Sequence, residues 1–393
     1  MVRFILENAL AMRIEKVVII IPTYNEALVI EDTLVEVFQE ASNISNMEIH
    51  VLVFDSQSTD NTQQVVTQLQ KNYPRLHLIT EPKKSGLGSA YRQAMHYALT
   101  ELSADIIFEF DADRSHQPKY IAPMLEKIQS QDVVVGSRYV HGGSIPKEWG
   151  WHRKCLSVLG NYVARLMLTR KYKDFTSGFR ATRRQVLTTV LPEKFISNQY
   201  AYKIQLLWLL HKAKARICEY PIDFIDRQKG NSKLPANSIS DSLHVLFTLR
   251  FHELKAYFKM CLVGLSGVGV QFLTYNILRQ SFSPITATQM AIITAIVSNF
   301  VLNNRYTFKR MSKIPRYQKF TSLSLFVGYS LLMIVFQSYW LHLGIKYFGT
   351  GFLSENLSIL SGMILGSIFN YLTYSRLIWR ERKGEPSAYS SPL

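Results

Sequence analysis

The chain has 393 residues, enough for two or three domains, and its formal net charge of +16 favours anionic partners such as nucleic acid, anionic lipid head groups or phosphorylated substrates. The basic residues are scattered and accompany no nucleic-acid-binding motif, so nucleic acid is not an expected partner. The three cysteines, Cys155, Cys218 and Cys261, lie far apart without a C-x-x-C pair, which argues against a disulfide framework or a zinc site.

The first half of the chain alternates strand-like runs with helix-like segments. No signal peptide is expected before it, because Glu7 interrupts the short apolar stretch at the N-terminus. Strands are predicted at residues 17–21, 49–54, 76–79, 106–110 and 133–136, and helices at about 27–40, from 60–62 onward and at 86–99. This order predicts an α/β fold with a mostly parallel, doubly wound sheet.

Polar residues follow four of the predicted strands. They are Thr23 and Glu26, Asp55, Asp111 and Asp113, and Ser137 and Arg138. Because the carboxyl ends of parallel strands meet at one edge of a sheet, these residues are expected to border a single crevice.

Asp111 and Asp113 are the most informative pair. Side chains two positions apart leave a strand on the same face, so the carboxylates would converge if the extended geometry persisted beyond the strand. Two neighbouring carboxylates repel unless a cation lies between them, and hard oxygen ligands suit Mg²⁺ or Mn²⁺. A solvated turn after a strand is the alternative interpretation.

The second half is far more apolar. Segments 260–278, 284–304, 320–345 and 356–375 contain no charged residue and reach the ~20 residues that a membrane-spanning helix needs. Buried core helices are the alternative. The basic loop after the second segment, which begins with Arg305, places both termini and this loop on the cytoplasmic side of a membrane. The segment from Ile239 to Tyr257 has the pattern of an amphipathic helix, either at the membrane surface or as an ordinary surface helix.

Seven motifs give the first half a resemblance to inverting family 2 glycosyltransferases, specifically the dolichyl- or polyprenyl-phosphate mannosyltransferases and their glucosyl relatives. The motifs are P-T-Y-N-E (22–26), D-S-Q-S-T-D-N-T (55–62), G-L-G-S-A-Y (86–91), D-A-D-R-S-H (111–116), G-S-R-Y-V (136–140), T-S-G-F-R (176–180) and D-R-Q-K-G-N-S-K-L (226–234). The second half resembles the four-helix GtrA-like membrane domain.

The resemblance implies a particular domain organisation. A cytosolic glycosyltransferase domain of the GT-A type would cover residues 1–235, an amphipathic interface region 236–257, and a domain of four transmembrane helices 258–383. Residues 384–393 would form a disordered tail. The chain would then be an integral protein of the cytoplasmic or inner membrane, with its catalytic domain on the cytoplasmic side.

The resemblance also implies a donor site. Asp113 would bind Mg²⁺ or Mn²⁺ directly, Asp111 would contact the nucleotide or reach the metal through water, and Ser115 is a further candidate ligand. The remaining donor-binding residues implied are Pro22, Tyr24, Glu26, Asp55 and Ala112, joined by Arg227 and Lys233 in a loop that would close over the diphosphate.

The acceptor site follows from phosphate chemistry. A phosphate monoester has its second pKa near ~6 and is already a nucleophilic anion at neutral pH, so positive charge is needed rather than a general base. The resemblance assigns this role to Arg138, Arg153 and Ser157, and an arginine fork matches phosphate geometry bidentately.

The implied reaction is the inverting transfer of a hexose from a nucleotide sugar to a polyprenyl or dolichyl phosphate. GDP-mannose is the expected donor, with UDP-glucose or another UDP-sugar as the alternative. An alternative hypothesis of a different class is that the protein is a non-catalytic flippase or scaffold for lipid-linked sugars. The sequence leaves the oligomeric state and the lipid chain length open.

Overall fold

The computed structural model describes residues 15–226, 237–302 and 316–373, and these form two compact units that meet in sequence between Arg250 and Phe251. Several predictions lie outside the described residues. They concern the N-terminal stretch, Arg227 and Lys233, most of the basic loop that begins at Arg305, and the C-terminal tail.

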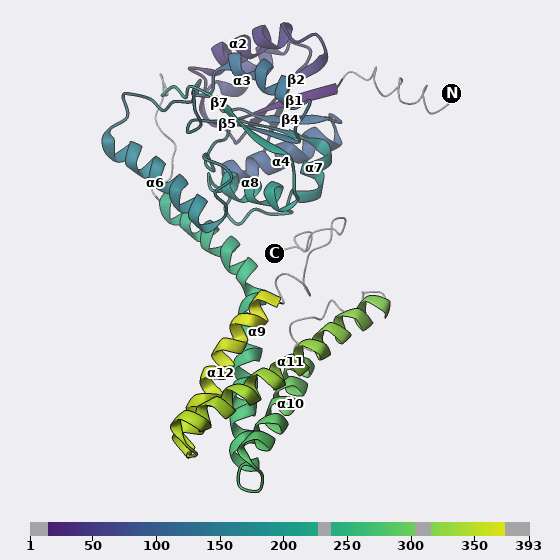
Figure 1. Ribbon diagram of the computed structural model, residues 1–393. Helices are drawn as coiled ribbons and strands as arrows, with labels where there is room; N and C mark the ends of the chain where they lie inside the picture. Colours follow the sequence, from purple (N-terminus) through teal and green to yellow (C-terminus); the bar gives the residue numbers. More distant parts are fainter. Residues whose placement is uncertain (1–14, 227–236, 303–315, 374–393) are drawn as a thin grey trace. The chain divides into compact units, whose positions relative to one another are not determined.

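The first unit contains a seven-stranded sheet (Figure 1) in the order β3-β2-β1-β4-β6-β5-β7. The strands are β1 (Glu15–Thr23), β2 (Met47–Asp55), β3 (Leu76–Thr80), β4 (Ile106–Glu109), β5 (Val133–Ser137), β6 (Arg180–Arg183) and β7 (Ile217–Pro221). All pairings are parallel except those of β6, which runs antiparallel to both β4 and β5. The predicted mostly parallel α/β sheet is therefore confirmed, with β6 and β7 as unpredicted additions.

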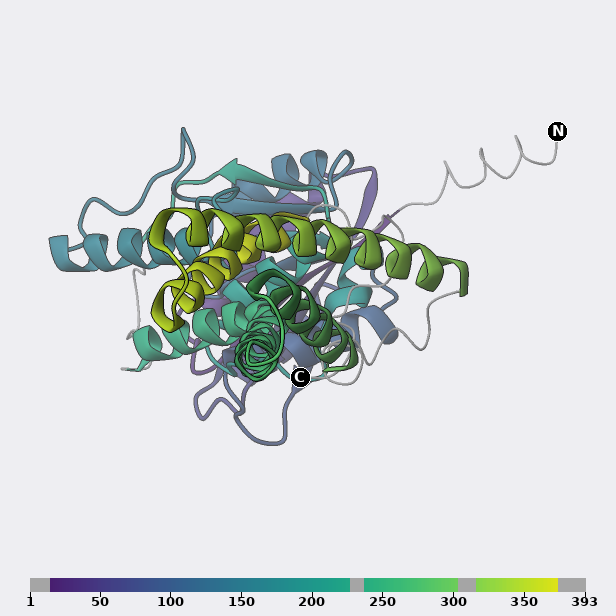
Figure 2. The same ribbon diagram turned by 60° about the horizontal axis from the view of Figure 1, so that its bottom comes forward.

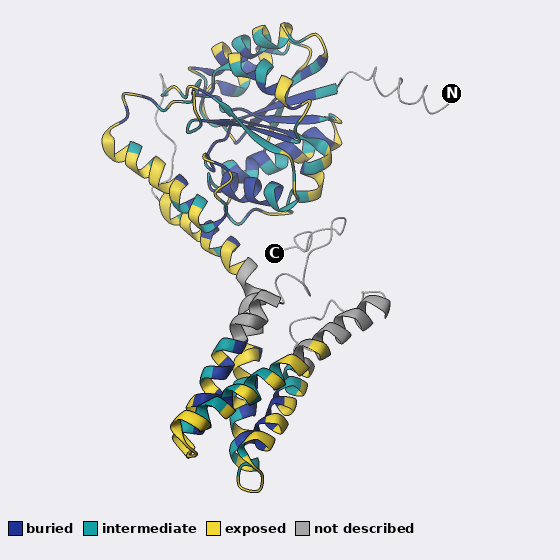
Figure 3. Cartoon of the chain, viewed as in Figure 1, coloured by how far each residue is buried: buried dark blue, intermediate teal, exposed yellow. Residues whose placement is uncertain are grey.

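Helices pack on both faces of this sheet. They are α2 (Ile30–Ser42), α3 (Thr62–Leu69), α4 (Leu87–Thr100), the short 3₁₀ helix η1 (Pro118–Tyr120), α5 (Ile121–Lys127), α6 (Trp151–Met167), α7 (Arg184–Val190) and α8 (Tyr202–Lys212). β1 shows why residues 17–21 are uniformly apolar: Val18 and Ile20 enter the core formed with α4 and α8, while Val17, Ile19 and Ile21 enter the core formed with α2 and α5. Figure 3 shows the central strands among the buried parts of this unit.

The second unit is built from the part of α9 (Ser238–Leu278) that follows Arg250, together with α10 (Pro284–Leu302), α11 (Arg316–Phe348) and α12 (Phe352–Thr373). Figures 1 and 2 show α11 turning back into α12 through a short connection. Tyr275, Ala291, Leu341 and Ile359, one from each helix, contribute to a shared buried cluster. The four uncharged segments are thus helical wherever the structure describes them.

One prediction for this region is not confirmed and another is confirmed in part. No helix of the described residues is long and apolar enough to cross a membrane, so the four predicted spans are not confirmed by the structure. The segment Ile239–Tyr257 is helical, as predicted, and forms the first part of the continuous helix α9, whereas its place at a membrane surface stays a prediction. Its residues Val245, Leu246 and Leu249 are buried in the core of the first unit, because apolar side chains on one face of this helix complete that core.

Candidate active site

The carboxyl edge of the sheet borders a cavity of about 250 Å³. Its walls come from the ends of β1 and β2, the start of α4, the turn after β4 and the segment before α8. The lining residues are Pro22, Thr23, Tyr24, Glu26, Ser56, Lys84, Gly86, Leu87, Asp111, Ala112, Asp113, Gln199 and Tyr200. The crevice predicted at this edge is therefore present in part: it brings together six of the predicted donor-binding residues, whereas Asp55, Ser137 and Arg138 do not line it.

The two aspartates reach the cavity from a turn rather than from an extended strand. β4 ends at Glu109, and the following residues turn so that Arg114 adopts a φ of +64°. The condition that extended geometry persists beyond the strand is therefore not met, since local hydrogen bonds hold the residues after Phe110 in a turn. Ser115 donates to Asp113 Oδ1 from its backbone N–H at 3.1 Å and from its Oγ at 2.5 Å. Both carboxylates nevertheless line the cavity.

Asp111 is held by buried neighbours. Its backbone N–H donates to His116 Nδ1 at 3.0 Å, and Tyr91 donates its hydroxyl to Asp111 Oδ1 at 3.2 Å. Burial lowers the pKa of His116, although the nearby Asp111 charge opposes this shift. Since Nδ1 accepts a hydrogen bond, the neutral ring carries its proton on Nε2, which lies 3.6 Å from Asp111 Oδ2.

A buried ion pair joins Glu109, which lies two residues before Asp111, to Arg180 of β6. Arg180 of β6 contacts Glu109 of β4 through Nε at 2.5 Å and Nη2 at 2.9 Å, and Tyr202 donates to the same carboxylate at 3.0 Å. Arg180 and Glu109 are both essentially inaccessible to solvent. A fully satisfied buried network of this kind favours one conformation for the strand end that carries Asp111.

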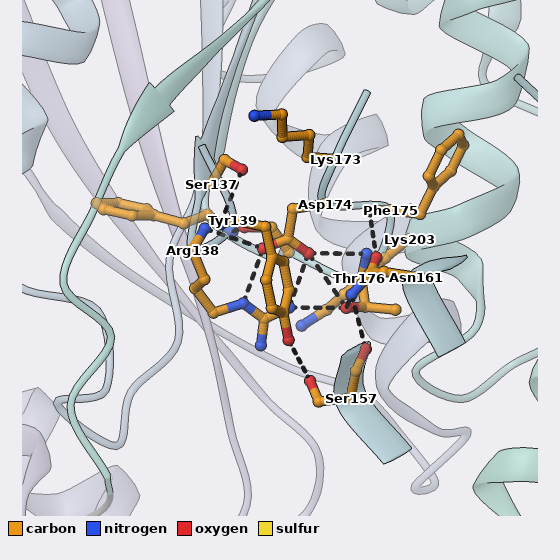
Figure 4. Close-up of polar contacts among 12 residues, drawn as sticks. Ser137, Arg138, Tyr139, Ser157, Asn161, Lys173, Asp174, Phe175, Thr176 and Lys203 are labelled. Atoms are coloured by element: carbon orange, nitrogen blue, oxygen red, sulfur yellow. Dashed lines mark hydrogen bonds and ion pairs between the residues drawn. The ribbon is translucent and has the colours of Figure 1, made fainter. Parts of the chain in front are cut away.

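A second polar cluster surrounds Arg138 at the end of β5 (Figure 4). Arg138 donates to Asp174 through Nε at 2.8 Å and Nη2 at 2.7 Å, and Nη2 also donates to Thr176 Oγ1 at 2.7 Å. Burial raises the pKa of Asp174, but the charge and hydrogen bonds of Arg138 outweigh it, so the pKa lies below its usual value. Among the described residues, Arg138 Nη1 has no hydrogen-bond partner, which leaves one edge of the fork available to a ligand.

The other two predicted phosphate-binding residues, Arg153 and Ser157, lie one turn apart near the start of α6. Ser157 Oγ is 2.6 Å from the Tyr139 hydroxyl, and the Tyr139 ring lies 5.4 Å from the Arg138 guanidinium. Ser157 thus joins the Arg138 cluster. Arg153 is exposed, pairs with Asp226 at 3.2 Å and stacks on Trp149.

Both halves of the chain match known protein families. Residues 18–191 match the family described as glycosyl transferase family 2, and residues 259–379 match the GtrA/DPMS transmembrane domain family. A dolichol-phosphate mannosyltransferase from Pyrococcus furiosus is 31% identical over 378 residues, which cover 93% of this chain and 99% of that protein. The chain belongs to the family of dolichol-phosphate mannosyltransferase-like glycosyltransferases with a GtrA-like domain.

Two further likenesses accompany this one. A polyprenol monophosphomannose synthase from Mycolicibacterium smegmatis is 32% identical over 231 residues, covering 58% of this chain and 84% of that protein. The mannosyl-3-phosphoglycerate synthase from Rubrobacter xylanophilus has a TM-score of 0.47 at 17% identity, covering 63% of this chain and 76% of that structure. The resemblance inferred from the seven sequence motifs is thus confirmed at the level of the family.

One predicted donor ligand of this glycosyltransferase does not line the cavity. Asp55 is fully buried and accepts hydrogen bonds from Thr23 at 2.9 Å, from the Ser58 hydroxyl at 2.5 Å and from Gln63 at 2.6 Å. In this arrangement Asp55 ties the end of β1 to the loop after β2, and the adjacent Ser56 faces the cavity instead. Binding of the nucleobase by Asp55 stays a prediction.

Sequence reasoning missed several residues that line the cavity, among them Lys84, Gln199 and Tyr200. Lys84 Nζ lies 3.2 Å from the centre of the Tyr24 ring, a cation–π contact at the mouth of the predicted nucleotide site. A signal for Lys84 was present, because it stands two residues before Gly86 of the G-L-G-S-A-Y motif. Gln199 and Tyr200 belong to no motif and come close only through the packing of α8 against α4.

The donor set suits a hard divalent ion. Asp111 and Asp113 present carboxylate oxygens to the same cavity, which is the ligand chemistry of Mg²⁺ and Mn²⁺. In the described part of the chain, no group of three or more His, Cys, Asp or Glu side chains is arranged to hold a metal by itself. Two carboxylates fit an ion that takes its other ligands from water and from substrate phosphates. Ser115, the third predicted ligand, hydrogen-bonds to Asp113 in this structure.

Proposed function

We propose that this chain transfers a hexose, mannose from GDP-mannose, to a polyprenyl or dolichyl phosphate with inversion at the sugar. One observation carries the proposal: Asp111 and Asp113 open into one cavity with Pro22, Tyr24 and Glu26, as expected for a nucleotide-sugar site. The near full-length likeness to a protein named dolichol-phosphate mannosyltransferase supports both the mannosyl group and the lipid phosphate.

The donor would bind with its diphosphate beside the two aspartates. A bound Mg²⁺ or Mn²⁺ would offset the negative charge that develops on the departing diphosphate. Asp113, with its Oδ1 fixed by Ser115, is the proposed direct ligand, and Asp111 is held by Tyr91 for contact with the nucleotide or a metal-bound water. Ala112 lies between them on the cavity wall.

The acceptor would bind beside the Arg138 cluster. The free Nη1 edge of Arg138, together with Ser157 and Arg153, would hold the lipid phosphate as a dianion. A phosphate oxygen attacks the anomeric carbon on the face opposite the diphosphate, and the bond from that carbon to the diphosphate oxygen breaks. No side chain needs to remove a proton, because the phosphate is already ionised at neutral pH. The lid function of Arg227 and Lys233 remains part of the proposal and concerns residues outside the described ones.

Membrane attachment is the second part of the proposal, with both termini and the catalytic domain on the cytoplasmic side. It is supported by the match of residues 259–379 to a transmembrane domain family. It is also supported by α6, on which large apolar side chains lie exposed (Figure 3), including Trp151 at 78%, Leu159 at 56%, Tyr162 at 59% and Leu166 at 60%. An exposed apolar face with interspersed basic residues suits the surface of a bilayer, where a lipid phosphate is presented.

Two other functions are separated from this one by a direct assay. They are transfer of glucose from UDP-glucose or another UDP-sugar, and a non-catalytic role as a flippase or scaffold. Radiolabelled nucleotide sugars are supplied one at a time with polyprenyl phosphate and Mn²⁺ or Mg²⁺, and label is counted in the chloroform-extractable lipid. We expect label from GDP-mannose and its loss on chelation of the metal. Label only from a UDP-sugar would transfer the assignment to that donor, and no label from any donor would favour the non-catalytic role.

A further inference from the structure

Lys203 is a buried cation beside the aspartate pair that the proposed mechanism does not use. It lies in the first turn of α8, and its side chain is only 7% exposed. Its Nζ is 3.7 Å from Asp111 Oδ2, on the carboxylate that Tyr91 and His116 also contact. Lysine is almost never buried without a partner, and here the partner is a residue of the proposed metal site.

The surrounding fold makes room for this lysine. A methyl group placed on Gly178 would overlap both Nζ and Cε of Lys203, so glycine at this position lets the T-S-G-F-R segment lie against the end of the lysine side chain without displacing it. The neighbouring residues Tyr202 and Leu206 of α8 are fully buried and anchor the helix that carries Lys203. Figure 4 shows Lys203 drawn with the Arg138 cluster. The ammonium group therefore lies beside Asp111 in a largely buried position.

The charges explain what this placement does. Asp111 and Asp113 carry two negative charges, and Lys203 compensates one of them. A divalent ion that binds without nucleotide is attracted less strongly by the two aspartates, because the nearby ammonium group of Lys203 repels it. A nucleoside diphosphate brings further negative charge and phosphate ligands, which restore the attraction.

We propose that Lys203 is a positioning residue that holds the Asp111 carboxylate and weakens the binding of free metal, so that the ion enters the site together with the nucleoside diphosphate. This inference rests on the proposed metal-assisted sugar transfer. It goes beyond that function because it names the residue that makes binding of the metal depend on the bound nucleoside diphosphate. The consequence is that the empty enzyme discriminates against free divalent ions, although its two aspartates face the cavity.

The test measures binding of Mn²⁺ by electron paramagnetic resonance of the free ion, with the full chain in detergent and without sugar or lipid. Wild type, Lys203→Met and Lys203→Gln are compared without nucleotide and with saturating GDP. Lys212→Met is the matched control, because it removes the same charge from the other end of α8. Circular dichroism and the thermal midpoint establish that each variant is folded.

We expect both neutral variants at position 203 to bind Mn²⁺ without GDP at concentrations roughly tenfold lower than wild type, as the loss of a unit charge close to the ion implies. With GDP the difference should shrink, and Lys212→Met should behave as wild type throughout. Unchanged or weaker Mn²⁺ binding in both position-203 variants would overturn the inference. Loss of GDP binding with unchanged Mn²⁺ binding would also overturn it, and would make Lys203 a phosphate ligand.

The proposed function is judged separately by the wild-type protein. If wild type binds Mn²⁺ with GDP but the variants show no shift, only the role of Lys203 fails. If no form binds Mn²⁺ even with GDP, the proposed metal site itself fails and the role of Lys203 fails with it. Label transfer into lipid by wild type, measured in parallel, shows whether the transferase assignment survives that outcome.

Discussion

At the scale of single residues, some members of the site could be predicted from the sequence and others could not. Asp111 and Asp113 were predicted because two carboxylates after a strand indicate metal chemistry, and Arg138 was predicted because the family resemblance assigns it to the acceptor phosphate. Asp174 could not be foreseen as the partner of Arg138, since the two are 36 positions apart and meet only when β5 and the segment before β6 are packed. Lys203 was missed for the same reason, because a lysine inside an apolar helix carries no local signal of the carboxylate that it meets.

Asp113 is expected to be indispensable for transfer. Asp113→Asn removes the charge of the proposed direct metal ligand while keeping its shape, and should lower the rate of label transfer by about 10²–10³-fold. Ser115→Ala removes only the hydrogen bond that orients Asp113 and should cost far less. Rates are measured in the lipid-extraction assay at saturating donor. If Asp113→Asn retains most of the wild-type rate, the metal assignment at this residue is wrong.

The Arg138–Asp174 pair should make stability depend on pH. The folded pKa of Asp174 is depressed, so its contribution to the free energy of unfolding is complete above the ordinary carboxyl pKa of ~3.9 and is lost as the pH falls through the folded pKa. Asp174→Asn should destabilise the protein by about 3–5 kcal/mol at pH 7, because it leaves a buried arginine without a counter-charge. Urea unfolding between pH 3 and 7 measures both effects.

The control for that prediction is Asp132→Asn. Asp132 also pairs with an arginine, Arg216 at 2.9 Å, but Arg216 is largely exposed, and solvent screens such pairs. Loss of the Asp132 carboxylate should therefore destabilise the protein far less than loss of the Asp174 carboxylate. Equal effects of the two substitutions would mean that burial of the Arg138 pair does not determine its contribution.

At the scale of elements, periodicity predicted β1 to β5 but missed β7 and the polar antiparallel strand β6, which lies between β4 and β5. β1 and β2 contain apolar runs, whereas β6 reads R-A-T-R and resembles a loop. Its Arg180 can be buried in the centre of the sheet only because Glu109 faces it from β4. A cross-strand partner of this kind is a tertiary contact that local sequence does not reveal.

The start of α4 requires glycine at position 86. Gly86 has a φ of +99°, and an added methyl group would collide with the backbone oxygen of Asn198. Gly86→Ala should therefore destabilise the protein by about 1–3 kcal/mol and, since Gly86 lines the cavity, weaken nucleotide binding. Gly160→Ala is the control, because Gly160 lies inside α6 with no neighbouring atom in the way. That change should be neutral or stabilise by up to ~1 kcal/mol. Thermal melts measure the stability of both variants, and GDP titration measures their nucleotide binding. Similar results for Gly86→Ala and Gly160→Ala would mean that the backbone at position 86 does not require glycine.

For the whole molecule, the sequence pattern distinguished a sheet-containing half from a helical half and predicted a helix in the segment between them. Residues 239–257 belong to one helix, α9, whose first part contributes to the buried core of the first unit, a contact that the pattern did not predict. The amphipathic pattern was real. It could not tell whether the apolar face meets lipid or protein, because both are apolar. Val245 and Leu249 face protein, whereas Phe247, on the opposite side of the helix, is 63% exposed.

The contacts of the first part of α9 determine where the chain can be truncated without loss of the folded first unit. A chain that ends after Arg250 keeps Val245, Leu246 and Leu249 in the core and keeps Asp241, which accepts a hydrogen bond from Ser197. A chain that ends at residue 236 loses all of these contacts, and burial of three such side chains amounts to about 5 kcal/mol or more. We expect the longer piece to bind GDP with the affinity of the full chain, and the shorter piece to be unfolded or to bind poorly. The comparison uses urea unfolding and GDP titration of both pieces. Equal stability would mean that the start of α9 belongs to the second unit after all, whereas loss of GDP binding by both would place part of the donor site beyond residue 250.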